Sequence, residues 1–173
     1  STFNPALAYE MTKHIAGELN TIGVKQVLAP CIDVARELRW GRVEESFSED
    51  PFLCARMAVA EVKGYMDHGI SPMAKHYGPH GNPLGGLNLA SVECGIRDIL
   101  RDRFGFRGYV YSDWGVIDML KNFHKTADND FEAASQALTA GLDVEASSLC
   151  FKSLESKVLA GEFDVRYIDR AVK

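Results

Sequence analysis

Residues 108–115 have the sequence GYVYSDWG, and this stretch decides how the rest of the chain is interpreted. An apolar, β-prone run stops abruptly at an acid, a large aromatic ring and a glycine. The pattern predicts a short buried strand over Gly108–Tyr111, with Asp113 just beyond its carboxyl end. Barrels of alternating strands and helices place their chemistry at this end of the strands, so Asp113 is the first candidate functional residue.

Three further strands are expected around this one, at Val24–Val34, Ile70–Tyr77 and Leu142–Glu145. Helical patterns separate them, and the first helix should have Asn4 as its N-cap and an apolar face at helical spacing. Such alternation implies parallel strands with helical crossovers, and therefore the α/β class. The face consists of Leu7, Met11, Ile15 and Leu19. The expected helices are 5–22, 51–67, 91–104, 127–140, 149–159 and 165–172.

The length of the chain limits the choice of architecture. A complete eightfold barrel needs about 250 residues, whereas this chain has 173. An open doubly wound sheet and a barrel that lacks some of its pieces both fit the pattern of elements.

Composition excludes some classes of protein. The net charge is −5, without a basic stripe for phosphates, which argues against nucleic-acid binding. No apolar run approaches the roughly 18 residues of a membrane span, so no membrane association is expected. The four cysteines form no CxxC pair, so a zinc site is not expected and most should be buried free thiols.

Two other predicted strand ends also carry polar side chains. The first strand is followed by RWGRVEE at residues 39–45, where the donor fork of Arg42 suits hydroxyl or carboxylate groups. The alternative for Arg39 or Glu45 alone is an ordinary salt-bridged loop. The second strand ends at Lys75 and His76, which can both reach a ligand only if the strand stops there.

A metal or another cofactor is not expected at these strand ends. His76 and His80 are four residues apart, but the intervening proline and glycine argue against a helix that would join them in one site. The ring of Trp114, beside the acid, is a surface of the kind that packs on the face of a sugar. Taken together, the three strand ends favour a small-molecule or oligosaccharide substrate.

In these stretches the chain resembles the N-terminal barrel domain of glycoside hydrolase family 3, the β-glucosidase-like enzymes. The similar segments are LAPCIDVAR at 28–36, RWGRVEESFSEDP at 39–51, Lys75-His76 with the loop that follows, GYVYSDW at 108–114, and the end of the chain from Ala140. The resemblance implies a TIM-type (β/α) barrel and a retaining hydrolysis of O-glycosidic bonds. It implies Asp113 as the catalytic nucleophile, Arg42, Lys75 and His76 as ligands of sugar hydroxyls, and Trp114 as a wall of the pocket.

The chain also departs from the family pattern. The barrel is expected to be incomplete, without the family's first strand and without an internal segment near Ile99, so residues 1–173 would form a partial barrel domain. A second α/β sandwich domain, on which this one would pack, is expected to supply the acid/base. We expect a periplasmic or secreted location rather than a cytoplasmic one.

Two other functions fit the same residues. The pocket of an inactive relative would bind sugar without turnover. A Schiff-base lyase would use Lys75 as its nucleophile, although it would leave Arg42 and Trp114 without a role.

Overall fold

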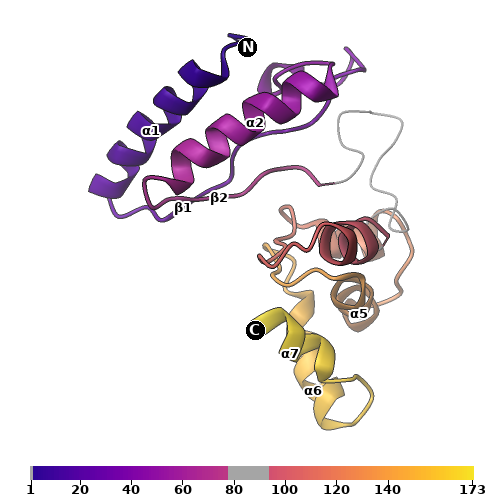
Figure 1. Ribbon diagram of the computed structural model, residues 1–173. Coiled ribbons are helices and arrows are strands. Elements are labelled where there is room, and N and C mark those ends of the chain that lie inside the picture. The colour runs from indigo at the N-terminus through magenta and orange to yellow at the C-terminus, as the bar shows by residue number, and fades with distance from the viewer. Residues whose placement is uncertain (1, 78–93) are drawn as a thin grey trace. The chain divides into compact units, whose positions relative to one another are not determined.

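The computed structural model describes residues 2–77 and 94–173, and the chain divides into two compact units. Unit 1 comprises residues 1–88 and unit 2 comprises residues 89–173. In Figure 1, unit 1 is coloured from indigo to magenta and the described part of unit 2 from red to yellow. The predicted loop at 78–88 and the start of the helix predicted from Ser91 lie outside the described residues.

Both helices of unit 1 begin where the sequence predicts. Helix α1 spans Pro5–Thr21, and the side chain of Asn4 accepts a hydrogen bond from the N–H of Leu7 at 3.2 Å. Helix α2 spans Pro51–Met66 and is capped in the same way by Asp50. Proline in the first turn costs each helix nothing, because the first N–H groups of a helix have no partner within it.

The buried face of α1 differs from the predicted one. Leu7 and Met11 are about half exposed, at 52% and 49%, whereas Ala8, Thr12 and Ala16 are buried. The cause is the close approach of α2: a β-carbon on Gly64 would lie only 2.0 Å from Oγ1 of Thr12. Small side chains therefore line this contact, and bulky ones are displaced from it. Ile15 and Leu19, the other half of the predicted face, are partly buried and pack on the core formed by Ala16, Tyr65 and Ile70.

The strands of unit 1 are parallel, as predicted, but much shorter. Strand β1 (Gln26–Val27) pairs with β2 (Ser71–Pro72), with Val27 opposite Pro72. Pairing resumes at an isolated parallel bridge between Cys31 and Lys75. The β1 side therefore has one more residue than the β2 side between these two pairs, which is a bulge. Pro30 lies in this interval and has no N–H to donate, which interrupts the ladder predicted over 24–34.

Unit 2 is mainly helical. The segments are η2 (Cys94–Arg103, a π-helix), α4 (Val116–Asn122), α5 (Asp130–Ala140), η3 (Cys150–Ser153, 3₁₀), α6 (Leu154–Leu159) and α7 (Arg166–Val172). Helix α4 was not predicted, and the helix predicted over 149–159 is divided into η3 and α6. The core packs α4, α5 and α6 together through Ile117, Leu120, Leu138 and Leu154, among others.

The two strands predicted in unit 2 are reduced to one parallel bridge between Tyr111 and Val144. The structure confirms that the two segments are adjacent and parallel, but they are shorter than predicted. The N–H of Val110 is bound at 2.7 Å by the side-chain carboxylate of Asp143, so it is not available for a regular ladder. Among the described residues, no helix is long and apolar enough to cross a membrane.

Candidate functional site

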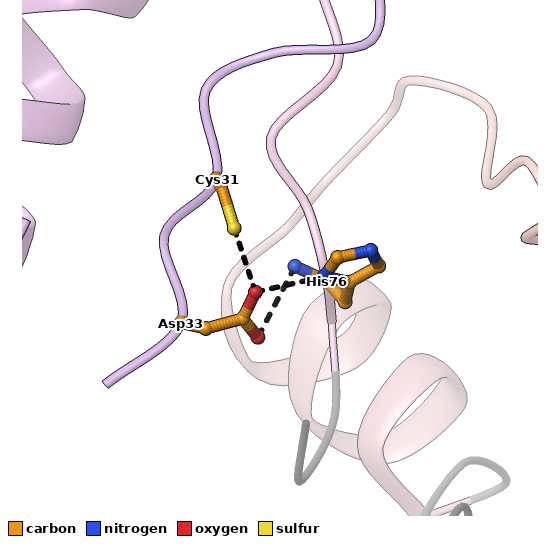
Figure 2. Close-up of side chains that lie close together, drawn as sticks. All are labelled: Cys31, Asp33 and His76. Atoms are coloured by element: carbon orange, nitrogen blue, oxygen red, sulfur yellow. Dashed lines mark hydrogen bonds and ion pairs between the residues drawn. The ribbon is translucent and has the colours of Figure 1, made fainter. Parts of the chain in front are cut away.

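The strand ends of unit 1 bring Asp33 and His76 together. Because the two chain segments run parallel, their carboxyl ends meet at one edge. Nδ1 of His76 lies 2.7 Å from Oδ2 of Asp33, and the backbone N–H of His76 lies 3.5 Å from Oδ1 (Figure 2). The Asp33 side chain is 1% exposed and that of His76 is 14% exposed. One buried carboxylate thus holds both the ring and the backbone of His76.

Arg42 contacts the other side of the same imidazole. Its Nη1 lies 3.3 Å from Nε2 of His76, across 34 positions of sequence. Nε and Nη2 of Arg42 donate to the two carboxylate oxygens of Glu45 at 2.6 and 2.7 Å. These hydrogen bonds hold the pKa of Glu45 below its usual range. Glu45 belongs to the 3₁₀ helix η1 (Val43–Glu45), which places the carboxylate one turn from the guanidinium.

Lys75 follows β2 in the chain and is the last residue there that pairs with the first strand. Its N–H donates to the carbonyl of Pro30 at 2.9 Å, and its carbonyl accepts from Ile32 at 2.5 Å. The side chain of Lys75 is partly buried. Pairing with the first strand stops at Lys75, two residues before the predicted end of the strand at Tyr77, and His76 lies just beyond it. Unit 1 therefore places Arg42, Lys75 and His76 in one neighbourhood.

Asp113 and Trp114 belong to unit 2, where they follow the Tyr111 bridge directly. The Asp113 carboxylate accepts the N–H of Trp114 at 2.7 Å, and the Trp114 ring is 76% exposed. The backbone around them is fixed, because buried Ser112 accepts the N–H of Ala146 at 2.8 Å and Gly115 donates to the carbonyl of Ala146. An exposed acid on a fixed backbone is suited to contact a ligand.

The two acids near the second strand of unit 2 have structural roles. Asp143 forms a short ion pair with Arg101, and its side chain is 4% exposed. Glu145 accepts the N–H groups of Cys150 and Phe151 at 2.7 and 2.9 Å, so it caps η3. Both carboxylates are therefore engaged in holding the local structure.

Cys31 completes the buried cluster around Asp33. Its thiol donates to Oδ2 of Asp33 at 2.9 Å, and burial together with this hydrogen bond raises the pKa of Cys31 to about 12. Cys31, Asp33 and His76 have atoms of types that bind metals, and these atoms lie within 4.8 Å of one another. The three cysteines whose side chains the structure describes, Cys31, Cys54 and Cys150, are buried free thiols, as predicted.

Asp33 was not predicted as a functional residue. It lies in the apolar stretch LAPCIDVAR, and the strand pattern alone treats that stretch as core. A signal was present, since a carboxylate inside an apolar run is costly unless it is hydrogen-bonded. Cys31 and Asp33 are also two residues apart and so share one face of the strand.

Comparison with known proteins identifies the family. The model of the "Glycosyl hydrolase family 3 N terminal domain" matches residues 1–97 and 90–173. The chain belongs to glycosyl hydrolase family 3. This confirms the predicted family, and with it the α/β class and the TIM-type barrel architecture, of which this chain holds an incomplete set of strands.

Named relatives agree with this assignment. A β-xylosidase of Formosa agariphila is 29% identical over 230 residues, which cover 99% of this chain and 32% of the relative. A periplasmic β-glucosidase of Salmonella typhimurium is 25% identical over 221 residues, covering 100% and 29%. The solved β-glucosidase of Listeria innocua in complex with glucose is 26% identical, with a TM-score of 0.90, over 98% of this chain and 30% of that one.

The comparisons also bear on the missing internal segment. Both alignments with the curated relatives are longer than the 173 residues of this chain, so each relative has residues within the matched region that have no counterpart here. The family match itself is divided into two segments that overlap at residues 90–97. Both observations agree with a segment absent near Ile99. The chain spans about a third of the length of these relatives.

Proposed function

We propose that the intact protein is a retaining, exo-acting β-glycosidase of the β-glucosidase type, with Asp113 as its nucleophile. The observation that carries this proposal is the position of Asp113 in a family 3 chain: its side chain is exposed directly after a paired strand end whose backbone is fixed by Ala146. A carboxylate at this place can reach a substrate without reorganising the fold, which is what nucleophilic catalysis requires.

The proposed reaction has two steps. The Asp113 carboxylate attacks the anomeric carbon, the bond from that carbon to the leaving oxygen breaks, and a carboxylic acid protonates the leaving oxygen. Water then attacks the same carbon, gives its proton to the second carboxylate, and releases Asp113. Two inversions give net retention, and the two carboxyl groups stand about 5–5.5 Å apart.

Sugar recognition is assigned to Arg42, Lys75 and His76, with Trp114 as a wall of the pocket. Support comes from unit 1, where the contact between Arg42 and His76 forms a polar cluster at a strand edge. In unit 2, the exposed Trp114 ring adjoins the nucleophile. Arginine and lysine donate to hydroxyl oxygens, and an indole face packs on the apolar face of a pyranose.

The acid/base is assigned to a second domain of the parent chain, on which this barrel domain packs. The chain spans about a third of its curated relatives, which leaves room for such a domain. We propose β-glucosides as substrates and a periplasmic or secreted location, supported by the periplasmic β-glucosidase among the relatives.

The test is Asp113→Ala in the intact protein, assayed with an aryl β-glucoside. We expect turnover to fall by at least about 10³-fold, because the covalent step is lost. Added azide should restore turnover by attacking the anomeric carbon in place of the carboxylate, giving an α-glycosyl azide through a single inversion. The matched control is Asp102→Ala, which removes an exposed acid of η2 and should leave the rate unchanged.

Near-normal turnover of Asp113→Ala would exclude the nucleophile role. Binding of glucose by the intact wild-type protein in calorimetry, without hydrolysis of any aryl β-glycoside, would instead support a sugar-binding relative.

A further inference from the structure

We propose that Asp33 is a positioning residue: it locks His76 in the tautomer that carries its proton on Nδ1, so that Nε2 serves the site as a hydrogen-bond acceptor. This inference rests on the proposed function only where it concerns sugar binding. The statement about the ring concerns the protein by itself and is tested separately.

The first support is the way in which Asp33 is engaged. In the hydrogen bonds described above, its carboxylate acts only as an acceptor, from the His76 ring at 2.7 Å, from the Cys31 thiol at 2.9 Å and from the His76 backbone at 3.5 Å. The thiol is a donor in this cluster because its raised pKa keeps it protonated. The Asp33 carboxylate accepts a hydrogen bond from the thiol and has no proton of its own to donate. Nδ1 of His76 must therefore carry a proton, because otherwise its lone pair would face the carboxylate oxygen.

The second support is independent and comes from Arg42. A guanidinium only donates hydrogen bonds, and its Nη1 lies 3.3 Å from Nε2 of His76. Nε2 must therefore present a lone pair, because a proton there would oppose a second donor. The buried acid on one side of the ring and the cation on the other thus select the same tautomer. A doubly protonated ring would satisfy Asp33 but not Arg42.

The charged surroundings agree with this arrangement. Glu45 accepts from Nε and Nη2 of Arg42, while Nη1 lies 3.3 Å from the imidazole. Lys75 is adjacent in sequence and adds a second cation to the neighbourhood. With its proton on Nδ1, His76 is the hydrogen-bond acceptor among these donors.

The consequence for recognition is specific. Arg42 and Lys75 can only donate to a sugar hydroxyl oxygen, whereas Nε2 of His76 can only accept. In the complex Nε2 would take a hydroxyl proton in place of the Nη1 donor of Arg42 that it has here. One hydroxyl of the bound sugar would then be held from both sides, through its oxygen by a cation and through its hydrogen by the imidazole. A site built in this way rejects a deoxy sugar strongly, because its own polar groups would be left without partners.

The first experiment reads the tautomer directly. The intact protein is produced with ¹⁵N-labelled histidine, and the ring resonances of His76 are assigned by their loss in His76→Gln. We expect a protonated Nδ1 and an unprotonated Nε2 in the wild type at neutral pH. A proton on Nε2 in the wild type would overturn the inference, and this measurement needs no folded variant of Asp33.

The second experiment uses Asp33→Asn, which preserves shape but can turn an amide N–H toward Nδ1. We expect the ring to shift to the Nε2-protonated tautomer and kcat/KM for an aryl β-glucoside to fall by about 10- to 100-fold, the effect of losing a charged hydrogen bond. The control Cys31→Ala removes the other donor to Oδ2 and should keep the wild-type tautomer. A loss of activity with an unchanged tautomer would reduce Asp33 to a structural role and overturn the proposal.

The two proposals fail in distinguishable ways. If Asp113→Ala retains turnover while His76 shows the expected tautomer, the nucleophile assignment is wrong and the role of Asp33 stands. If Asp113→Ala behaves as expected but the tautomer is the opposite one, only the inference about Asp33 is wrong.

Discussion

The side-chain oxygen of Ser112 accepts the backbone N–H of Ala146 at 2.8 Å, in a buried position. The bond joins two segments that are also linked by the bridge between Tyr111 and Val144 and by backbone hydrogen bonds on either side of it. It lies directly before Asp113. A serine hydroxyl therefore adds to the backbone hydrogen bonds that hold the chain next to the proposed nucleophile.

Replacing Ser112 should lower stability more than a typical exposed substitution. Ser112→Ala leaves the buried N–H of Ala146 without its partner, and we expect a loss of about 1–3 kcal/mol in the free energy of unfolding. Urea unfolding measures this loss. Ser135→Ala is the matched control, because it removes a hydroxyl from helix α5, where alanine is the better helix former. An equal loss in both variants would contradict the assigned role of Ser112.

The contact between α1 and α2 gives a second matched pair of variants. Gly64→Ala places a β-carbon 2.0 Å from Oγ1 of Thr12 and 2.8 Å from the carbonyl of Tyr9, and we expect it to cost about 1–3 kcal/mol through overpacking. Gly17→Ala in α1 meets nothing within 4 Å and should raise stability by about 0.5–1 kcal/mol through helix propensity. Thermal or urea unfolding distinguishes the two, and a stabilising Gly64→Ala would show that the helices lie farther apart.

The ion pair between Arg42 and Glu45 predicts a pH dependence. The hydrogen bonds from Arg42 lower the pKa of Glu45 in the folded protein, so the pair contributes fully above the pKa of an unfolded glutamate, about 4.3. Its contribution is lost as the pH falls through the lowered value. Because the Glu45 side chain is 37% exposed, solvent screens the pair, and we expect the effect on Arg42 orientation to be clearer than the effect on stability.

A ¹³C titration of the Glu45 carboxyl group tests this prediction. We expect a midpoint below the ordinary range in the wild type and a return toward that range in Arg42→Gln. Arg39→Gln is the control, because the fork of Arg39 binds Glu37 instead. A Glu45 midpoint that does not respond to Arg42→Gln would show that the pair does not form in solution.

Much of the architecture could be predicted from the sequence, because helix starts and strand order have local signals. Asn4 and Asp50 cap helices followed by proline, and both helices begin there. The parallel direction of the strands follows from alternation with helices. Strand lengths could not be predicted in this way: the bulge before Cys31 and the binding of Val110 by Asp143 are tertiary effects that override β-propensity.

Part of the candidate site was proposed from the sequence alone. Its strand-end residues Arg42, Lys75 and His76 carry polar groups at visible boundaries, and the structure places them in one unit. Asp33 escaped prediction because its environment is determined by a partner 43 positions later, His76. The buried face of α1 could not be predicted for a similar reason, since the space available at Thr12 is determined by Gly64.

The bulge between Val27 and Cys31 has a consequence for transferring residue roles between relatives. Without it, these two residues would share a face, since side chains alternate along a strand. Val27 packs against the Ala16–Tyr65–Ile70 core. The extra residue reverses the alternation, so Cys31 and Asp33 are expected on the opposite side. A sequence alignment that omits the extra residue of the bulge would place Asp33 on the other face of the sheet. The carboxylate that binds His76 would then be taken for a polar residue at a core position.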